Sequence, residues 1–485
     1  MNSALAEQLA QKTGRHIYAA SLAQDGAATY FLGRAESRRM LGVLGRSAAF
    51  PGTSDGDVKW FACTPETAAA LRERLPWLAP RPMGLARAAG CGDRLGLATP
   101  GHVRAFRETA GIAPFFAQQS IRENARTGRS PQEVFDDAMW GVFQEGWRDA
   151  WGADADHLKT EADVDACAAT GYSFYTLDPG DHVDGEAATA PLPDLRAKWD
   201  RLPWENLAAT PADLQSLYLG PTFHLDGGAS LAFSQETLWR AAAKYGRAIV
   251  HVVGLYRRLA SHRVPFDLEV SVDETDTPTT PLEHLYIASE LRRLGVRWVS
   301  LAPRYPGRFE KGVDYLGDLG QFETDLAMQA AVARTLGPYK LGIHSGSDKF
   351  SLYPIFARVV GERVHLKTAG TSYLEALRAV AVTEPDLFRQ IYQLAFERYA
   401  QDRLTYHVSA DPTLAPPLQG VPTSSLPEVL NQFDAREMLH VTFGSALARY
   451  GHRLKESLRE NEEAYYAALL AHLGRHLRPL VGATP

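Results

Sequence analysis

A unit made of a short strand, a polar turn and an amphipathic helix occurs eight times between about residue 83 and residue 385. Alternation of this kind implies parallel strands joined by helical crossovers. Eight units within roughly 300 residues fit a closed α/β barrel of the (β/α)8, TIM-like class, and an open doubly wound sheet is the competing arrangement. The strand segments of the units lie at 84–96, 112–120, 152–159, 172–184, 266–276, 296–307, 339–349 and 363–370.

The rest of the chain divides around this barrel. Residues 1–80 predict a small N-terminal α/β domain, and the barrel is expected at 81–385. An insertion at about 184–230, rich in Pro, Asp and Leu, interrupts the barrel, and we expect it to cover the barrel mouth. Residues 386–485 show mainly helical patterns and predict a C-terminal helical extension. Within the first domain we expect strands at 16–22, 28–33 and 58–63 and a helix at 64–75.

Charge and cysteine content restrict the compartment and the partners. The net charge of −6 does not favour nucleic acid or an anionic membrane as a partner, so an acidic ligand needs a local basic pocket. Three widely spaced cysteines without a CxxC motif argue for a reducing compartment. No signal peptide is visible, and no stretch approaches the roughly 18 apolar residues of a membrane span. We therefore expect a cytoplasmic protein and leave its oligomeric state open.

Strand parity places an unusual set of side chains inside the barrel. Side chains alternate along a strand, and the branched apolar residues that face the helices share one parity. Val270 and Val272 take the helix side, so Glu269 and Asp273 point inward. A barrel interior is ordinarily packed with Val, Ile and Leu, so polar inward residues near the C-terminal strand ends predict an active site. The same rule turns inward Asp154, Asp156, Thr176, Asp178, Lys340, His344, His365 and Lys367.

Imidazoles and carboxylates on neighbouring strands suit a divalent cation such as Zn, Mn, Ni or Co. Burying so many ionisable groups is costly unless they are paired or bind a metal. We assign Glu269, His344 and His365 as metal ligands, with Asp273 as a fourth ligand or a replacement. The competing interpretation is a buried salt-bridge network without a metal.

Two further segments carry polar residues at strand ends. The stretch GADADHLK brings His157 next to Asp156, which favours a catalytic or substrate-binding role over a solvated turn. In SVDETDTPTTPLEH, helix capping by Thr279 or Thr280 before Pro281 explains part of the pattern. The stretch GCGDRLG at 90–96 is not a GxGxxG fingerprint, so no bound NAD is expected.

Six stretches of this sequence closely resemble the tagaturonate epimerase family. The likeness runs in the same order from about residue 85 to residue 450, and several stretches exceed eight residues. It implies a metal-dependent isomerase of hexuronate catabolism that interconverts tagaturonate and fructuronate, and family members are also associated with 4-epimerisation of fructose and tagatose. The stretches are FFAQQSIREN, MWGVFQEG, WGADADHLK, EVSVDETDTPTTPLEH, IHSGSDKFSLYP and HLKTAGTSYLEALR.

The implied reaction inverts a carbon that is β to the ketone, so the carbonyl does not acidify its C–H bond. Retro-aldol cleavage and re-addition is one route, and transient oxidation by bound NAD is the other. A Lewis-acidic metal and inward carboxylates favour the first route. We expect Asp156 or Asp178 to be the general base, and Asp273 to be a further catalytic carboxylate.

Lysines and polar residues complete the expected site. Lys367 could hydrogen-bond a developing oxyanion, and a Schiff base at Lys367 or Lys340 is the less favoured role. The small-molecule substrate is expected to be a sugar acid or a ketose. Two other functions stay open, namely a different metal-dependent sugar isomerase or aldolase, and a non-catalytic sugar-acid-binding protein. Substrate binding is assigned to Gln119, Arg122, His157, Lys340, Ser347 and Lys349, with Arg122, Ser347 and Lys349 as candidates for holding a carboxylate.

Overall fold

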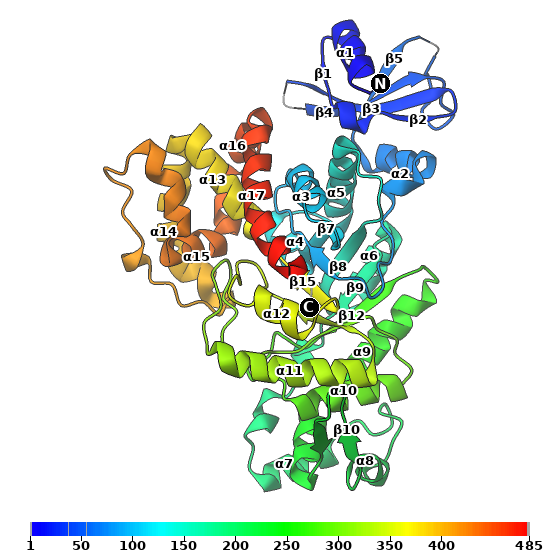
Figure 1. Cartoon of the computed structure of the whole chain (residues 1–485), viewed down its shortest axis with the longest axis vertical. Helices are drawn as coiled ribbons and strands as arrows, with labels where there is room; N and C mark the ends of the chain where they lie inside the picture. The colour runs from blue at the N-terminus through cyan, green and yellow to red at the C-terminus, as the bar shows by residue number, and fades with distance from the viewer. Residues whose placement is uncertain (1, 37, 55, 483–485) are drawn as a thin grey trace.

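The computed structural model describes residues 2–36, 38–54 and 56–482. Eight parallel strands close into a single barrel, so the closed arrangement is confirmed. The barrel strands lie in the centre of the molecule (Figure 1). Neighbours around the cylinder follow the order β12-β13-β14-β15-β6-β7-β8-β9. The strands are β6 (Ala88–Gly90), β7 (Ala113–Ser120), β8 (Gly152–Leu158), β9 (Phe174–Leu177), β12 (Asp267–Ser271), β13 (Ser300–Ala302), β14 (Lys340–Ile343) and β15 (Val364–Lys367).

Helices return the chain from each strand to the next, as the alternation of the sequence predicts. Local sequence signals fix where several of them begin. Thr280 accepts a hydrogen bond from the backbone N–H of Glu283 and Pro281 is the first helical residue, which is the expected capping pattern. The barrel helices are α3 (Thr99–Arg107), α4 (Ile121–Thr127), α5 (Pro131–Glu145), α6 (Glu161–Thr170), α9 (Gln235–Ser261), α10 (Pro281–Arg293), α11 (Leu319–Leu336), α12 (Tyr353–Val359) and α13 (Thr371–Thr383).

The apolar residues predicted to face outward do so. Val270, Val272, Leu341 and Ile343 are fully buried in the core between the strands and their helices. The barrel interior has two levels. Its floor contains Ala88 together with the aromatic rings of Phe115 and Phe174, and the polar residues lie above this floor.

The N-terminal part is an antiparallel sheet that lies at one end of the molecule (Figure 1). The strand expected at 16–22 is shorter than predicted, because only β1 pairs and the chain then turns through a 3-10 helix. Strand β4 was not predicted, because its three central residues are all buried and therefore show no two-residue alternation. The elements are α1 (Asn2–Thr13), β1 (His16–Ile17), β2 (Ala23–Asp25), β3 (Ala28–Ala35), β4 (Arg38–Gly45), β5 (Val58–Ala62) and α2 (Pro65–Arg74).

The C-terminal part is helical, as predicted, and packs on the barrel. Helix α17 lies against α3, α12 and α13, so it joins the layer of helices that surrounds the strands. None of the helices formed by the described residues combines the length and the apolar character needed to cross a bilayer. The helices are α14 (Pro385–Asp402), α15 (Phe433–Val441), α16 (Phe443–Glu460) and α17 (Glu462–Val481).

The insertion after β9 packs beside the barrel instead of over its mouth. Tyr218 donates a hydrogen bond to Glu290 of α10 (2.8 Å), and Arg293 of α10 donates to the carbonyl of Leu207 (2.6 Å). Its Leu and Trp side chains are buried against α9 and α10, which explains this position at the lower end of Figure 1. The expectation that it covers the mouth was wrong, because the described residues lining the mouth come from other loops. It contains α7 (Leu192–Asp200), α8 (Pro211–Tyr218), β10 (Thr222–His224) and β11 (Ser230–Ala232).

Candidate functional site

The upper half of the barrel interior is a polar network centred on the ammonium group of Lys367. Its Nζ lies 2.8 Å from Asp154 Oδ2, 2.7 Å from Asp156 Oδ1 and 2.9 Å from Glu269 Oε1. Burial by itself lowers the pKa of Lys367, but these three carboxylates raise it well above the ordinary value. Lys367 is therefore held as a cation, and it does not offer the free amine that a Schiff base requires.

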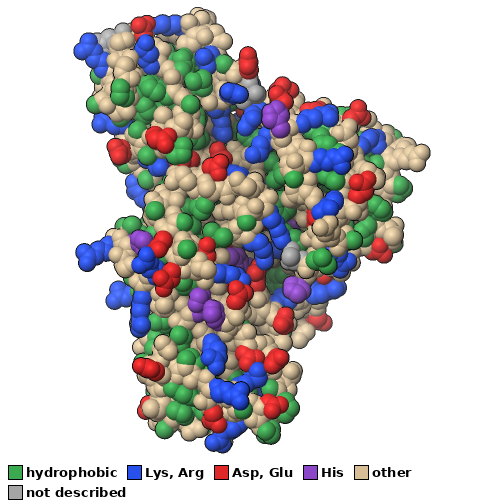
Figure 2. All heavy atoms as spheres, turned by 180° about the vertical axis from the view of Figure 1, so that it is seen from behind, with side chains coloured by type: hydrophobic (Ala, Val, Ile, Leu, Met, Phe, Trp, Pro, Cys, Tyr) green, Lys and Arg blue, Asp and Glu red, His purple; other side chains and the backbone are tan. Residues whose placement is uncertain are grey.

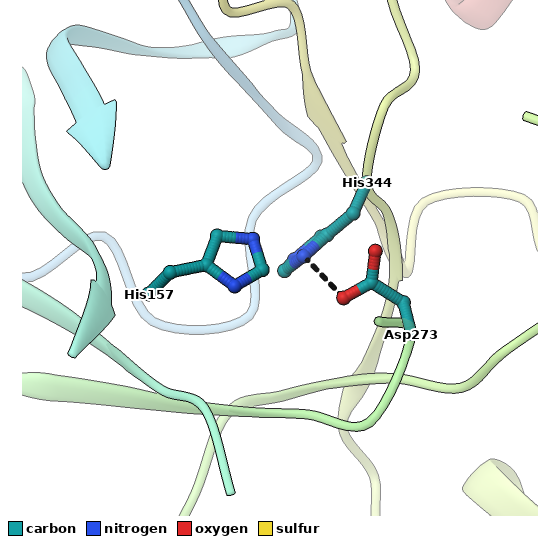
Figure 3. A group of neighbouring side chains, drawn as sticks. All are labelled: His157, Asp273 and His344. Carbon is teal, nitrogen blue, oxygen red and sulfur yellow. Dashed lines mark ion pairs between the residues drawn. The ribbon is translucent and has the colours of Figure 1, made fainter. Parts of the chain in front are cut away.

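Three ligand-type side chains meet above this network. His157 belongs to β8, Asp273 follows β12 and His344 follows β14, and one potential ligand atom of each lies within 4.8 Å of the others. Figure 3 shows the two imidazole rings close together and the Asp273 carboxylate directed at His344. The distance between His344 Nδ1 and Asp273 Oδ1 is 3.1 Å. Two imidazoles and a carboxylate form a donor set that suits a divalent transition metal.

A carboxylate holds the second nitrogen of each imidazole. Glu269 Oε1 lies 2.6 Å from His344 Nε2, and Asp178 Oδ2 lies 3.1 Å from His157 Nδ1. Each ring therefore keeps one nitrogen for the cluster. Metal-binding histidines are usually fixed in this way by a carboxylate behind the ring, because it sets the tautomer and the ring orientation.

The surrounding carboxylates also raise the affinity of the imidazoles for protons. Burial lowers the pKa of His157, but Asp156, Glu274 and Asp178 raise it to about 10. For His344, burial and Lys367 lower the pKa, and Asp273 and Glu269 raise it to about 9. The negative electrostatic potential of these carboxylates stabilises the protonated imidazoles, and it also favours a divalent cation at the same place.

The backbone at His157 departs from ordinary strand geometry. Its φ is +54°, and the pairing of β8 with β9 shifts register between Ala155 and Leu158. Regular alternation would place Asp156 and His157 on opposite faces, whereas here both side chains reach the barrel mouth. A positive φ outside glycine is uncommon and is found preferentially at functional sites.

A cavity of about 490 Å³ opens over the cluster, and a smaller hollow of about 30 Å³ continues down to Asp156 and Lys367. The loop after β13 and residues 406–407, which follow α14, form part of the wall, so the C-terminal extension contributes to the mouth. The lining carries both signs of charge, as a site for a polar ligand requires. It includes Arg122, Lys159, Asp273, Glu274, Arg304, Lys311, His344, Ser345, Tyr406 and His407.

The structure brings together most of the residues that the sequence predicted for the site. Those that line the two cavities or directly contact a lining residue are Arg122, Asp156, His157, Asp178, Glu269, Asp273, His344 and Lys367.

Two predicted residues lie on the barrel floor instead. His365 is the register partner of Gly342 in β14. Its ring packs against Phe115 and Phe174 at centroid distances of 5.1 and 4.9 Å. Its Nε2 is 4.0 Å from Asp154, and His365 does not join the His157–Asp273–His344 group. Lys340 lies beside the same rings and does not line the mouth cavity. Strand parity predicted the correct face for both residues, but it does not report the level within the barrel.

Three other predicted substrate-binding residues point away from the cavity. The amide of Gln119 donates to Asn124 of α4 (2.9 Å), while the neighbouring Gln118 donates to Asp156 (2.6 Å) and lines the hollow. The ammonium group of Lys349 is buried and donates to the carbonyls of Glu310, Val313 and Ser347. Lys349 and Ser347 therefore fasten loops. Their polar groups make hydrogen bonds within the protein backbone. A sequence pattern cannot distinguish a polar residue with this role from one that binds a ligand.

Lys311, Arg304, Tyr406 and His407 line the mouth cavity but were not predicted from the sequence. Lys311 donates to Ser345 (2.6 Å) and borders both cavities. Arg122, which was predicted, borders both cavities as well and is paired with Glu274 at 2.7 Å. Lys311 lies in a long loop after β13 that has no periodic pattern. The only available signal was its position after a barrel strand, where active-site loops occur.

A second ligand-type group lies outside this site. Asp348, His472 and His476 are close together and fully or almost fully buried. Burial raises the pKa of Asp348, but Arg436 and His472 lower it well below the ordinary value, and Arg436 lies 3.1 Å from Oδ1. The negative charge is thus already balanced, and the group joins α17 to the loop after β14.

A closed barrel with acid–base residues and a donor set for a cation at its C-terminal mouth defines a (β/α)8-barrel enzyme. Comparison with known proteins identifies its class. The family model described as tagaturonate epimerase matches residues 18–480, so the chain belongs to the tagaturonate epimerase family. It is accordingly an isomerase, an epimerase that acts on carbohydrates and their derivatives.

Individual members of this family are similar to this chain over nearly its whole length. A tagaturonate/fructuronate epimerase from Thermotoga maritima is 41% identical over 478 residues, which are 97% of this chain and 98% of the relative. A crystal structure of the fructuronate-tagaturonate epimerase from Cohnella laeviribosi with one glycerol is 38% identical, covers 99% of both chains and has a TM-score of 0.92. The native crystal structure of that enzyme is 37% identical, covers 98% of this chain and 99% of the other, and also has a TM-score of 0.92.

Proposed function

We propose that the chain interconverts D-tagaturonate and D-fructuronate with the help of a divalent cation. The observation that carries the proposal is the meeting of His157, Asp273 and His344 at the base of the mouth cavity in a chain of this family. The relatives from Thermotoga maritima and Cohnella laeviribosi carry names for this interconversion. Cationic side chains around the cavity favour a substrate with a carboxylate over a neutral ketohexose.

The residues present fit a cation at this position. His157 and His344 each keep one nitrogen free of their orienting carboxylate, and Asp273 supplies an oxygen. These three residues would hold the ion, so His157 and Asp273 take the places that the sequence assigned to Glu269 and His365. A divalent cation bound there would act as a Lewis acid that polarises the substrate ketone.

Asp156 is the best placed general base. Its carboxylate borders the smaller hollow, whereas Asp178 is turned toward His157 and the backbone N–H of Gly180. Burial raises the pKa of Asp156, but Lys367, His157 and His344 lower it well below the ordinary value. The neighbouring cations therefore outweigh the effect of burial on the pKa of Asp156. This carboxylate is ionised at any working pH, and it acts through its position close to the substrate hydroxyl.

The residues support the following proton and electron transfers. Asp156 takes the proton of the hydroxyl on the carbon β to the ketone, and the bond between the α- and β-carbons breaks. The electron pair of that bond passes into an enediolate, and the β-carbon becomes an aldehyde. The aldehyde turns, the enediolate attacks its other face, and Asp156 returns the proton to the new alkoxide. Lys367 donates a hydrogen bond to the oxyanion that develops beside Asp156.

The substrate carboxylate has two candidate partners at the cavity wall. Arg122 and Lys311 border both cavities, and each lies beside an acid or hydroxyl that it could exchange for a ligand oxygen. Hydrogen bonds between a cation and a carboxylate are among the strong ones. These two residues take the role that the sequence assigned to Ser347 and Lys349 alongside Arg122.

The decisive experiment follows tagaturonate by NMR with the protein, after chelation, and after adding a divalent cation back. We expect fructuronate to form, its formation to stop on chelation, and activity to return with the cation. The same reaction in deuterium oxide separates the alternatives. Obligatory deuterium at the carbon next to the ketone would indicate an isomerase that moves protons, and release of two three-carbon fragments would indicate an aldolase. Either result would overturn the proposal.

A further inference from the structure

A second cavity, of about 440 Å³, is lined by other residues than the mouth cavity. It is enclosed by strands β3 and β4 of the N-terminal sheet, by residues 95–97 of the barrel, and by helices α16 and α17. Figure 2 shows Lys and Arg side chains in the seam between the N-terminal sheet and the C-terminal helices. Five cationic side chains line the cavity, namely Arg34, Arg38, Arg39, Lys455 and Arg459.

Four of these cations form two unfavourable pairs. Arg34 and Arg39 are direct partners across the β3–β4 ladder, where like charges destabilise a sheet. Lys455 and Arg459 are four residues apart on α16, where like charges destabilise a helix. Two independent elements thus turn a repelling pair toward the same hollow. A chain with a net charge of −6 has no general excess of cations that would produce this arrangement.

The two acids that line the cavity pair with Arg34 and Arg129, so they leave Arg38, Lys455 and Arg459 without an ion-pair partner within the described residues. Glu462 is engaged by Arg34 (3.1 Å) and by the hydroxyl of Tyr18 (2.9 Å), and Asp137 is engaged by Arg129 (2.5 Å). Within residues 2–36, 38–54 and 56–482, no hydrogen bond or ion pair is found for the side chains of Arg38, Lys455 and Arg459.

Lys455 and Arg459 are half-buried, whereas Arg38 is exposed at the rim of the cavity. Burial and the nearby Arg129 lower the pKa of Lys455, and burial and Arg39 lower the pKa of Arg459. A bound dianion would relieve this repulsion, since guanidinium groups match the oxygens of a phosphate. The lining also carries apolar and aromatic side chains, namely Leu95, Leu97, Leu458 and Tyr465. It can accept the organic part of a ligand.

We propose that this cavity binds a small phosphorylated metabolite of about the size of a hexose phosphate. Three cations without an ion-pair partner within the described residues, two of them half-buried, exceed what a single carboxylate needs, which favours the phosphate dianion. The cavity shares no lining residue with the mouth cavity, so the ligand would not compete with the sugar acid. The proposal does not depend on the function proposed above, because binding is measured without turnover.

Calorimetric titration of the full chain with glucose 6-phosphate tests the proposal, with inorganic phosphate, glucose and citrate as comparison ligands. We expect both phosphates to bind, glucose not to bind, and citrate to bind more weakly. The double variant Lys455→Met/Arg459→Gln should weaken binding of the phosphates at least about tenfold, which is the loss expected for one charge-assisted hydrogen bond.

Two single variants complete the test. Arg38→Gln removes a cation from the sheet side and should also weaken binding, even if the double variant does not fold. Arg449→Gln removes an exposed cation from the same helix α16 outside the cavity and should leave binding unchanged. Absence of phosphate binding at millimolar concentration, equal binding of citrate, insensitivity to both cavity variants, or competition by the sugar acid would each overturn the proposal.

Discussion

At the residue scale, the carboxylates behind the imidazoles matter as much as the cluster itself. Asp178 contacts His157 Nδ1 and also accepts the backbone N–H of Gly180 (2.8 Å), so its orientation is fixed from two sides. Glu269 plays the corresponding role for His344 and is also held by Ser300. Neither carboxylate is expected to touch the substrate.

Replacing Asp178 with Asn should lower the affinity for the divalent cation about 10- to 100-fold, the usual effect of losing an orienting carboxylate. Titration of metal-free protein with the cation measures this change. Asp181→Asn is a matched control, because Asp181 is an exposed acid of the same segment that pairs with Lys159. An unchanged affinity in Asp178→Asn would show that His157 does not bind the ion.

Lys311 should distinguish acidic from neutral substrates. We expect Lys311→Met to raise KM for tagaturonate about tenfold, because one charge-assisted hydrogen bond to the carboxylate is lost. The KM for tagatose, which has no carboxylate, should change much less. Steady-state kinetics with both substrates provides the comparison, and an equal loss with both would assign Lys311 to loop structure instead.

Lys340 should destabilise the barrel at neutral pH. It is fully buried beside two aromatic rings, and within the described chain its Nζ has no hydrogen-bond partner. Burial lowers its pKa from 10.5 to about 8, so the unfolded state binds the proton more tightly. The penalty is complete below about pH 8 and shrinks as the pH rises toward 10.5. It amounts to about 3 kcal/mol, since one pKa unit corresponds to about 1.4 kcal/mol.

Lys340→Met should therefore increase the free energy of unfolding at pH 7 and give a smaller gain at pH 9.5. Denaturant unfolding at both pH values measures the difference. A variant that is less stable at pH 7 would show that the ammonium group has a compensating partner.

At the element scale, loops that are distant in sequence build the mouth together. The segment after α14 carries Tyr406 and His407 into the cavity wall, and the loop after β13 carries Lys311. Glu310 fastens these two segments to one another, because it accepts a hydrogen bond from the backbone N–H of Ser409, and Glu437 of α15 accepts from the same N–H. Burial and Glu310 raise the pKa of Glu437. The contact between the two carboxyl groups therefore depends on a proton that Glu437 retains.

This contact should weaken as the pH rises. An acid whose pKa is raised in the folded state binds its proton more tightly there, so its stabilising contribution is lost as the pH rises from about 4.5 through the raised pKa. Glu437→Gln cannot ionise and should remove this part of the pH dependence. Unfolding at pH 5 and pH 9 tests it, and an identical pH dependence in both proteins would contradict the assignment.

At the scale of the whole molecule, binding of the cation is linked to folding. An ion that binds the folded chain alone stabilises it by about 2.7 kcal/mol at a concentration of 100 times its dissociation constant. We expect the melting temperature to fall on chelation and to rise again with added cation. His344→Ala should abolish this response. Full activity and an unchanged melting temperature after chelation would contradict the proposed cation dependence.

Proton release offers a second measurement of the same linkage. Neighbouring carboxylates keep both imidazoles protonated at pH 7, and a cation must displace those protons. Binding enthalpies measured in buffers of different ionisation enthalpy should therefore show protons leaving the protein.

The sequence by itself determined the barrel and the faces of its strands. The two-residue alternation of Val270, Val272, Leu341 and Ile343 is a local property, because each side chain either meets the helices or the interior. Caps such as Thr280 are equally local. These features could be predicted without knowing any partner, and the structure confirms them.

Only the tertiary structure decided which polar residues meet. Lys367 and His365 share a face of β15, yet Lys367 contacts three carboxylates and His365 packs on aromatic rings, because the register sets each residue's height in the barrel. The positive φ at His157 breaks the alternation of side chains along β8. The ammonium group of Lys349 donates hydrogen bonds to backbone carbonyls. The height of a residue in the barrel, the strand register and the loop contacts depend on segments that are far apart in the chain. A local sequence pattern therefore cannot predict them.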